Sequence, residues 1–145
     1  MVDVTDKPST RRSAVAQCQI VTSADLSGAA TGSDAPAMIH SARLAGILAA
    51  KQTAQLIPLC HPLNLEDIQV DVIDTADGVT IQSSVATIHQ TGVEMEALTA
   101  CAVAALSLQA SLLAIDPRVR MDDLVVLRKS GGRSGDWGRE TPTRS

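Results

Sequence analysis

The sequence predicts an α+β fold with one antiparallel sheet and two helices on one face of that sheet. Two long stretches of helical character, 37–55 and 89–115, alternate with shorter stretches that are rich in β-branched residues. Their order is strand, helix, strand, strand, helix, strand. The pair Asp77-Gly78 is a strong hairpin signal, so the two middle strands are expected to run antiparallel. This order is the βαββαβ pattern of a ferredoxin-like sandwich.

The first part of the chain is predicted to form an arm, a strand and a helix. The polar segment 1–13 is expected to become ordered only against another surface. Residues 14–22 alternate in part and end in β-branched residues, which predicts a strand. Glycines and a proline make 23–36 a loop or one weak helical turn. Small and apolar residues recur at steps of three and four within 37–55, which indicates a helix.

Two prolines stiffen the connection 59–65, which leads into the predicted hairpin. Alternating side chains predict one strand over 66–74 and its return strand over 79–88. A last strand is predicted over 122–128. The remaining residues, 129–145, are expected to form a basic, glycine-rich loop and a flexible tail.

The stretch 89–115 contains the longest apolar run of the chain. Ala and Leu dominate it, and both are strong helix formers. Thr91 or Gly92 is expected to cap its start, and two glutamates in the first turn suit the helix dipole. Asp116-Pro117 is expected to end it, because the residue before a proline disfavours the helical conformation.

We interpret this stretch as a buried helix, although its uncharged part is roughly 19 residues long and approaches a bilayer span. It carries Ser107, Gln109 and Ser111, and no aromatic anchors flank it. A helix that is apolar on nearly all sides must be covered on most of them. We therefore expect a subunit interface here.

Composition fits a single domain over 1–145 that associates with further copies. Hydrophobic residues make up 45% of the chain, but there is no Phe, no Tyr and one Trp. A core of Ala, Val, Leu and Ile buries little area per residue, so oligomerisation is expected to add buried surface. The net charge of -4 argues against nonspecific nucleic-acid binding, but it does not exclude an anionic small ligand.

The cysteines and the N-terminus indicate a cytoplasmic protein. Cys18, Cys60 and Cys101 are widely spaced and odd in number, which is typical of reduced thiols rather than of a disulfide framework. The N-terminus has no apolar segment of the signal-peptide kind. We expect neither membrane insertion nor nucleic-acid binding.

Cys60-His61 is the first candidate site, because two prolines hold a titratable ring on a stiff backbone. A structural turn with a half-buried His61 is an equal alternative. A zinc site is not expected, since His89 is the one other plausible ligand and no Cys-x-x-Cys spacing exists.

Two further candidates carry charges near glycines. Glu94 and Glu96 follow Gly92 at a helix start, but two residues apart on a regular helix they should not face one ligand. Carboxylates that serve only the helix dipole are the alternative reading. The loop from Lys129 to Asp136 offers glycine amides and two cations that suit phosphate, or else it is a flexible linker.

Together these stretches resemble the molybdenum-cofactor biosynthesis protein C family, the cyclic pyranopterin monophosphate synthases. The N-terminal Met-Val-Asp-Val, with Lys7, Thr10 and Arg12, is similar to the arm of that family, and the resemblance covers nearly the whole chain. The motifs that carry it, in order, are Ser41-Ala-Arg-Leu-Ala-Gly-Ile47, Ala49-Ala-Lys-Gln-Thr53, Leu56-Ile-Pro-Leu-Cys-His-Pro-Leu63, Thr91-Gly-Val-Glu-Met-Glu-Ala-Leu-Thr99, Val103-Ala-Ala-Leu106 and Lys129-Ser-Gly-Gly-Arg-Ser-Gly-Asp136.

The resemblance implies a ferredoxin-like subunit in a homo-oligomer, a hexamer built as a trimer of dimers around shared sites. It implies conversion of 3′,8-cyclo-7,8-dihydro-GTP to cyclic pyranopterin monophosphate, with release of pyrophosphate and without a metal or cofactor. At the pterin site it places Leu59, Cys60, His61, Met95 and Glu96. Around that site, as polar or phosphate-binding groups, it places Lys51, Glu94, Lys129, Arg133 and Arg12.

The chain departs from the family at four charged positions. The catalytic Asp and Lys of the family helix are replaced by Ala110 and Leu113. Two basic positions are also lost, at Ala35 and at Gln90. Losing a general acid or base typically lowers the rate by about 10²–10⁴-fold.

Three interpretations follow from these replacements. The chain is a working synthase whose acid and base work has moved to His61, Glu96 or Lys51. Alternatively, it is a non-catalytic paralogue that binds a pterin or nucleotide, or that joins a catalytic paralogue in a mixed oligomer. The third interpretation is an engineered or relic variant without a ligand.

Overall fold

The structure, a computed structural model, describes residues 1–26 and 34–140. It confirms the predicted order of elements and adds two short ones, α2 and β5. The elements are β1 (Thr10–Val21), α1 (Ala35–Lys51), α2 (Thr53–Leu56), β2 (Asp67–Thr75), β3 (Gly78–His89), α3 (Glu94–Leu112), β4 (Arg120–Ser130) and β5 (Trp137–Gly138).

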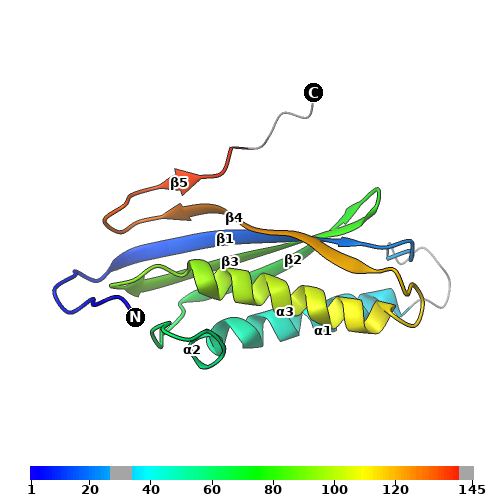
Figure 1. The fold of residues 1–145 in the computed structure, drawn as a ribbon, viewed down its shortest axis with the longest axis horizontal. Helices are drawn as coiled ribbons and strands as arrows, with labels where there is room; N and C mark the ends of the chain where they lie inside the picture. The colour runs from blue at the N-terminus through cyan, green and yellow to red at the C-terminus, as the bar shows by residue number, and fades with distance from the viewer. Residues whose placement is uncertain (27–33, 141–145) are drawn as a thin grey trace.

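The elements form two layers, with α1 and α3 lying side by side on one face of the sheet (Figure 1). The strand order is β2-β3-β1-β4-β5, and every neighbouring pair is antiparallel. The predicted α+β class is therefore confirmed, and the order of the first four strands is consistent with a ferredoxin-like arrangement. Strand β5 extends the sheet beyond β4.

Small side chains build the core between the two layers. Alternate residues of β1, among them Ala14, Ala16 and Cys18, are buried under the helices, and so are alternate residues of β3. From the helix side α3 contributes alanines and the fully buried Leu108. Because such side chains are short, the layers must approach closely to exclude water.

Gly46 is where α1 comes nearest to α3. A Cβ at this position would lie 2.7 Å from the carbonyl oxygen of Ala100 and 3.1 Å from the Cβ of Ala104. The first of these atoms is backbone, so it cannot rotate away. The two helices can pack at this separation only while the position has no side chain.

We expect Gly46→Ala to lower the free energy of unfolding by about 1–3 kcal/mol, because overpacking outweighs the better helix propensity of alanine. Urea unfolding followed by circular dichroism measures the change. Ser41→Ala, at an exposed position of the same helix, is the matched control and should change stability by less than about 0.5 kcal/mol. A Gly46→Ala protein as stable as the wild type would contradict the close packing described above.

Helix α3 is the core helix that the sequence predicts. Within the described part of the chain it is the single helix long and apolar enough to cross a membrane, but half of that window is buried inside the fold. Glu94 and Glu96 lie in its first turn, as predicted. The exposed large apolar side chains of α3 are Met95 in its first turn and Leu106, and Leu113 is exposed directly after its end.

Several predicted boundaries were wrong by a few residues. The N-cap of α3 is Val93 and makes no side-chain hydrogen bond, so neither Thr91 nor Gly92 caps the helix. The helix ends at Leu112, before the predicted stop. The carboxylate of Asp116 instead accepts hydrogen bonds from the backbone N–H groups of Ser23 and Arg118. These bonds hold the pKa of Asp116 at about 2 and fasten the turn after α3 to the end of β1.

Other differences concern the chain ends and the first helix. Strand β1 begins at Thr10, within the predicted arm, because residues 10–13 pair with β3. The helix predicted over 37–55 is divided at Gln52 into α1 and α2. Part of the loop predicted over 23–36 lies outside the described residues, and α1 already begins at Ala35.

Candidate functional site

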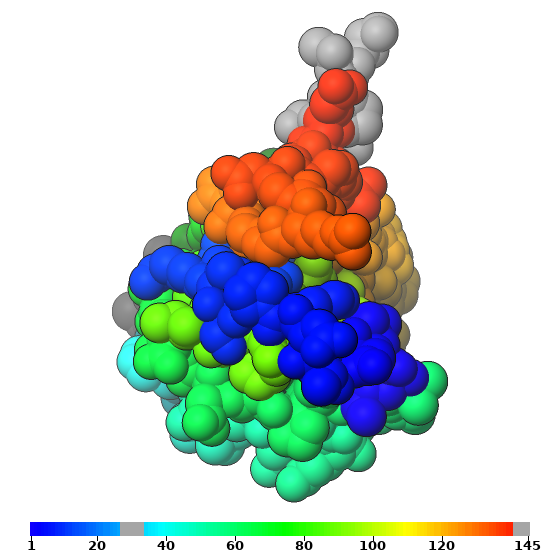
Figure 2. Space-filling view, turned by 90° about the vertical axis from the view of Figure 1, so that its left-hand side faces the viewer, coloured from blue at the N-terminus to red at the C-terminus, as the bar shows by residue number. Residues whose placement is uncertain are grey.

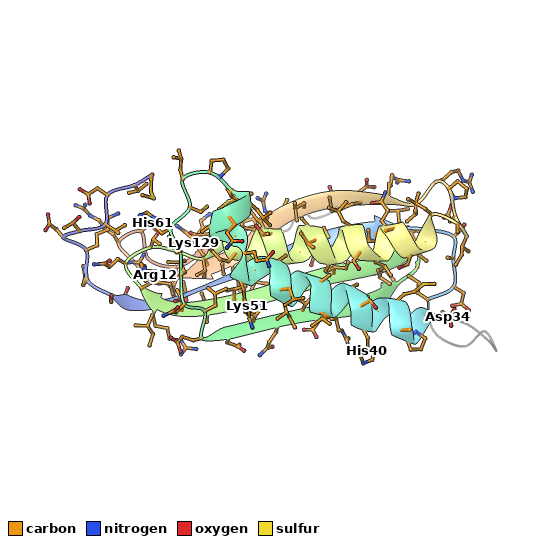
Figure 3. The ribbon with its side chains drawn as sticks, turned by 90° about the horizontal axis from the view of Figure 1, so that it is seen from below. Arg12, Asp34, His40, Lys51, His61 and Lys129 are labelled. Carbon is orange, nitrogen blue, oxygen red and sulfur yellow. The ribbon has the colours of Figure 1, made fainter. Side chains whose placement is uncertain are left out.

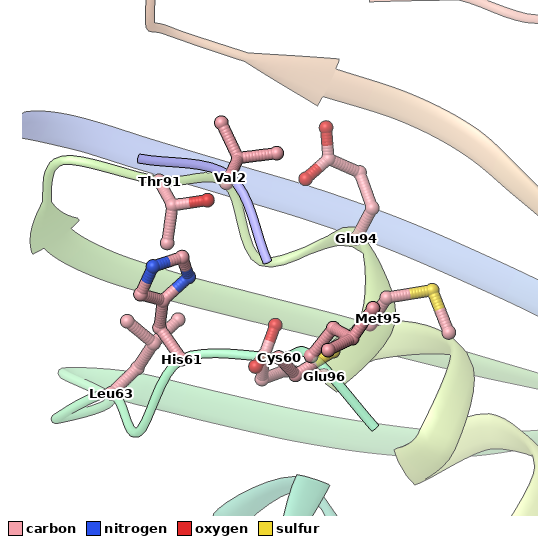
Figure 4. A pocket seen from close by; sticks show the side chains of 10 residues that line it. Val2, Cys60, His61, Leu63, Thr91, Glu94, Met95 and Glu96 are labelled. Atoms are coloured by element: carbon pink, nitrogen blue, oxygen red, sulfur yellow. The ribbon is translucent and has the colours of Figure 1, made fainter. Parts of the chain in front are cut away.

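A pocket of about 160 Å³ opens where the connection after α2 meets the start of α3 (Figure 4). Figure 2 looks at this end of the molecule, where the N-terminal segment lies between the β4–β5 hairpin and the green connection and helix start. The residues that line the pocket are Val2, Leu59, Cys60, His61, Leu63, Thr91, Gly92, Glu94, Met95 and Glu96.

A turn over Ile57–Cys60 presents Cys60 and His61 to this pocket. The N–H of Cys60 donates to the carbonyl oxygen of Ile57 at 3.4 Å. Pro58 occupies the second position of the turn, and Leu59 follows with a φ of 69°. A proline followed by a positive φ is the type II pattern, which normally takes glycine at the second of these positions. A leucine in this strained conformation is typical of functional sites.

The first turn of α3 supplies two carboxylates to the same pocket. Glu96 is buried, with 4% of its surface exposed, and lies beside Cys60, whereas Glu94 points toward β4 (Figure 4). The structure corrects the expectation that Glu94 and Glu96 do not face one ligand. The carboxylate of Glu94 folds back over Gly92, where a Cβ would overlap it, so both acids line one cavity from different sides.

The environment of the pocket favours the protonated forms of two groups. Burial raises the pKa of Glu96, and the negative charge of Glu94 adds to the effect. Burial also raises the pKa of the Cys60 thiol, with a further contribution from Glu96. A carboxylic acid that keeps its proton to higher pH can donate that proton to a bound substrate.

The basic segment that the sequence predicts as a flexible loop is a hydrogen-bonded turn between β4 and β5. Lys129 belongs to β4 and pairs with Trp137, and the N–H of Gly131 donates to Asp136 at 3.1 Å. The Nζ of Lys129 lies 3.3 Å from the Glu94 carboxylate and donates to Ser134 at 2.9 Å. The turn is thereby tied to the pocket.

A second, larger cavity of about 470 Å³ adjoins this turn. Arg12 lies at its wall, where its Nε donates to the carbonyl oxygen of His89 at 3.0 Å and its guanidinium lies against Gly132. The cavity collects four cations but one carboxylate. Its lining residues are Asp6, Lys7, Pro8, Thr10, Arg11, Arg12, Gly131, Gly132 and Arg133.

The other predicted basic residue, Lys51, is exposed at the end of α1. A third cavity of about 220 Å³ joins it to His61 and Glu96. Figure 3 shows Arg12, His61 and Lys129 toward one end of the molecule, Lys51 nearer its middle, and Asp34 and His40 toward the other end. The structure therefore brings the predicted site residues other than Lys51 to one end. Among the described residues, no three His, Cys, Asp or Glu side chains form a metal-binding group.

The four positions at which the resemblance implies the loss of a charged residue do not all lie at this end. Ala110 lies roughly 24 Å along α3 from Glu94, at about 1.5 Å per residue, and Leu113 lies beyond it. Ala35 starts α1 at the same far end, because α1 and α3 run in opposite directions (Figure 1). Gln90 alone lies near the pocket, between β3 and Thr91.

Four residues that line the pocket were not among the predicted site residues: Val2, Leu63, Thr91 and Gly92. Thr91 lies inside the motif that begins α3, and Figure 4 shows its side chain facing His61, so the motif itself held a signal. Leu63 lies in the same way within the proline-bracketed motif. Val2 had no local signal, because the fold of the whole N-terminal segment brings it to the pocket.

Comparison with known proteins shows the family of this chain. Residues 1–132 match the MoaC family. A cyclic pyranopterin monophosphate synthase of Corynebacterium efficiens is 48% identical, over 94% of this chain and 90% of the relative. That of Thermomicrobium roseum is 46% identical, over 97% and 87%. Cyclic pyranopterin monophosphate synthase 2 of Mycobacterium bovis is 45% identical, over 96% and 84%. With matches of this extent, the chain belongs to the MoaC family.

Proposed function

We propose that this chain acts in molybdenum cofactor biosynthesis as a cyclic pyranopterin monophosphate synthase. It takes 3′,8-cyclo-7,8-dihydro-GTP, rearranges it to cyclic pyranopterin monophosphate and releases pyrophosphate. The observation that carries this proposal is the pocket in which His61 and the buried Glu96 meet, with the cationic cavity beside it. The shared name of its relatives supports the same activity.

The two cavities suit the two parts of this substrate. The smaller pocket has apolar walls from Leu59 and Leu63 and polar groups that can bind the ring system. The larger cavity has the four cations and the glycine amides that a triphosphate requires. Lys129 pairs with Glu94 of the smaller pocket and is placed to exchange this carboxylate for a phosphate oxygen.

Proton transfer in this proposal is the work of the groups that line the pocket. Glu96, protonated to higher pH than an ordinary glutamate, is assigned as the acid. His61 faces the same space and is assigned as the base. Lys51 reaches the adjoining cavity and supplies positive charge. None of these roles requires an acid or base at Ala110 or Leu113.

The proposal includes a cytoplasmic homo-oligomer of single-domain chains, a hexamer formed as a trimer of dimers. The pocket of the same chain lies at the opposite end of α3 from positions 110 and 113. Side chains at these positions can therefore line only a pocket of another copy. The helices also keep an apolar surface for a partner, which consists of Leu44, Leu48, Leu106 and Leu113, each about half exposed.

A second candidate function rests on Ala110 and Leu113 themselves. Where the family has an Asp and a Lys, these side chains can transfer no proton. In that case the chain is a non-catalytic paralogue that binds a pterin or nucleotide and joins a catalytic paralogue in a mixed oligomer.

Pyrophosphate release from 3′,8-cyclo-7,8-dihydro-GTP distinguishes the two functions. We expect the wild-type chain to release pyrophosphate. The Ala110→Asp, Leu113→Lys double variant is measured beside it, with Ala110→Asn, Leu113→Met as a control of similar side-chain size. Release by the Asp/Lys variant alone would overturn the proposed activity in favour of the non-catalytic paralogue. If none of the three proteins releases pyrophosphate, the proposed activity is wrong, and the pocket cannot be regarded as intact.

A further inference from the structure

Two buried cysteines outside the proposed site face each other across the interior. Cys18 lies on β1 and Cys101 on α3, and both side chains are completely buried. The Sγ of Cys101 lies 3.2 Å from the Sγ of Cys18 and also donates to the carbonyl oxygen of Ile81 at 3.4 Å. The third cysteine, Cys60, lines the pocket and is half-buried.

The fold brings these two thiols together by a direct route. Cys18 belongs to the alternate residues of β1 that face the helices, between Ala16 and Ile20. Cys101 lies in the middle of the α3 surface that packs on the sheet. The pair therefore joins the two layers of the fold, at the centre of the core. Neither thiol lines any of the cavities described above.

We propose that Cys18 and Cys101 are a redox-active pair that closes to a disulfide when the protein meets a peroxide. One thiolate attacks the peroxide, which oxidises its sulfur to a sulfenic acid and releases water or an alcohol. The second thiol then displaces the hydroxyl as water, and the sulfur–sulfur bond forms. In sum, two thiols and one peroxide give one disulfide, one molecule of water from the condensation step, and one molecule of water or alcohol from the peroxide. A disulfide bond is about 2.05 Å long, so the sulfurs must approach by roughly 1 Å.

The environment of the pair sets the rate and the outcome of this oxidation. The hydrogen bond between the two thiols, together with burial, raises the pKa of Cys101, and the same hydrogen bond lowers the pKa of Cys18. Because the thiolate is the reactive form, Cys18 is the thiol that attacks the peroxide. Both side chains are completely buried, so the peroxide reaches them only when α3 opens locally from β1. A sulfenic acid formed in this way has the second thiol beside it, so condensation precedes further oxidation. The bond then holds α3, which carries Glu94 and Glu96, on β1.

The test uses the folded chain with Cys60→Ser, which leaves Cys18 and Cys101 as its thiols. Hydrogen peroxide is added, removed with catalase after set times, and the protein is then unfolded and its thiols counted. We expect both thiols to disappear together and the intact mass to fall by about 2 Da, with reversal by a phosphine reductant. Retention of both thiols, a mass increase from separate oxidation, or disulfide-linked dimers would each overturn the proposal.

Two matched variants separate an internal bond from general damage. Cys60→Ser with either Cys18→Ala or Cys101→Ala has one thiol and cannot form the internal bond. Neither should lose about 2 Da under the same treatment. Oxidised Cys60→Ser protein should also melt at a higher temperature than its reduced form, because the bond constrains the unfolded chain over a long loop. The one-thiol variants should show no such increase, and an equal increase in them would contradict the proposal.

Discussion

Glu96→Gln should lower the turnover number for pyrophosphate release by about 10²–10⁴-fold, the usual contribution of a general acid. The amide keeps the size and hydrogen-bonding shape of the carboxylic acid but cannot donate the proton that the reaction requires. Since Glu96 is buried at 4% exposure and lies beside Cys60, the replacement should leave the pocket in place. The Michaelis constant should therefore change little.

The pH dependence gives this prediction a second readout. Burial raises the pKa of Glu96, so its proton persists above the usual glutamate range and is lost as pH rises through the raised value. In the wild type the rate should therefore fall on that alkaline limb. In Glu96→Gln the residual rate should not show this fall at alkaline pH. An unchanged limb in the variant would assign it to another group and would contradict the role of Glu96.

Stability at neutral pH separates the catalytic role from a structural one. A folded-state pKa above the unfolded value stabilises the protein below the unfolded pKa, and this contribution is lost as pH rises. Burial disfavours the ionised form of Glu96. Glutamine carries no charge at any pH, so Glu96→Gln should unfold at the same urea concentration as the wild type or a higher one. A loss of both activity and stability would indicate damage to the fold instead.

Glu94→Gln is the matched control on the same helix turn. Glu94 is half-buried and paired with Lys129 at 3.3 Å, so it holds a cation of the basic turn and is assigned no proton transfer. Its replacement should change mainly the Michaelis constant, by altering how Lys129 is held. If Glu94→Gln and Glu96→Gln reduce turnover equally, the assignment of Glu96 as the acid is wrong.

The local sequence patterns were sufficient to predict the two layers of this fold. They were not sufficient to predict where each helix and strand begins and ends. Alternation in β3 and the Asp77-Gly78 signal predicted a hairpin that the structure contains. The N-cap of α3 was wrong, because Val93 begins the helix without a side-chain hydrogen bond and long-range packing holds it instead. The pairing of Lys129 with Trp137 was missed, since a two-residue strand has no recognisable period.

Some residues of the candidate site could be predicted from sequence motifs, whereas others are placed there only by the tertiary structure. Cys60, His61 and Glu96 lie within motifs, and the structure brings them to one pocket. The separation of roughly 24 Å between Glu94 and Ala110 already follows from their positions on one predicted helix. The sequence could not show that Val2 returns to the pocket wall, because this depends on how the N-terminal segment folds across the pocket.

Leu108→Ala should lower the free energy of unfolding by about 2–5 kcal/mol, the usual effect of removing a large side chain from a core. Leu108 lies near the C-terminal end of α3, is completely buried and belongs to the hydrophobic core. The short neighbouring side chains cannot move far enough to fill the space that is left. Urea unfolding at several protein concentrations measures the change and shows whether unfolding is linked to dissociation.

Leu106→Ala provides the comparison that tests the proposed oligomer. Leu106 lies two residues away on the same helix but is 54% exposed, so within one chain its truncation should cost less than about 0.5 kcal/mol. In a homo-oligomer that covers this face, the same truncation should instead promote dissociation, which sedimentation velocity detects as a slower species at low concentration. If Leu106→Ala leaves the sedimentation of an oligomer unchanged while Leu108→Ala destabilises the fold, the exposed side of α3 is not the interface. The partner must then cover another face, and a pocket could no longer acquire positions 110 and 113 from a neighbouring α3.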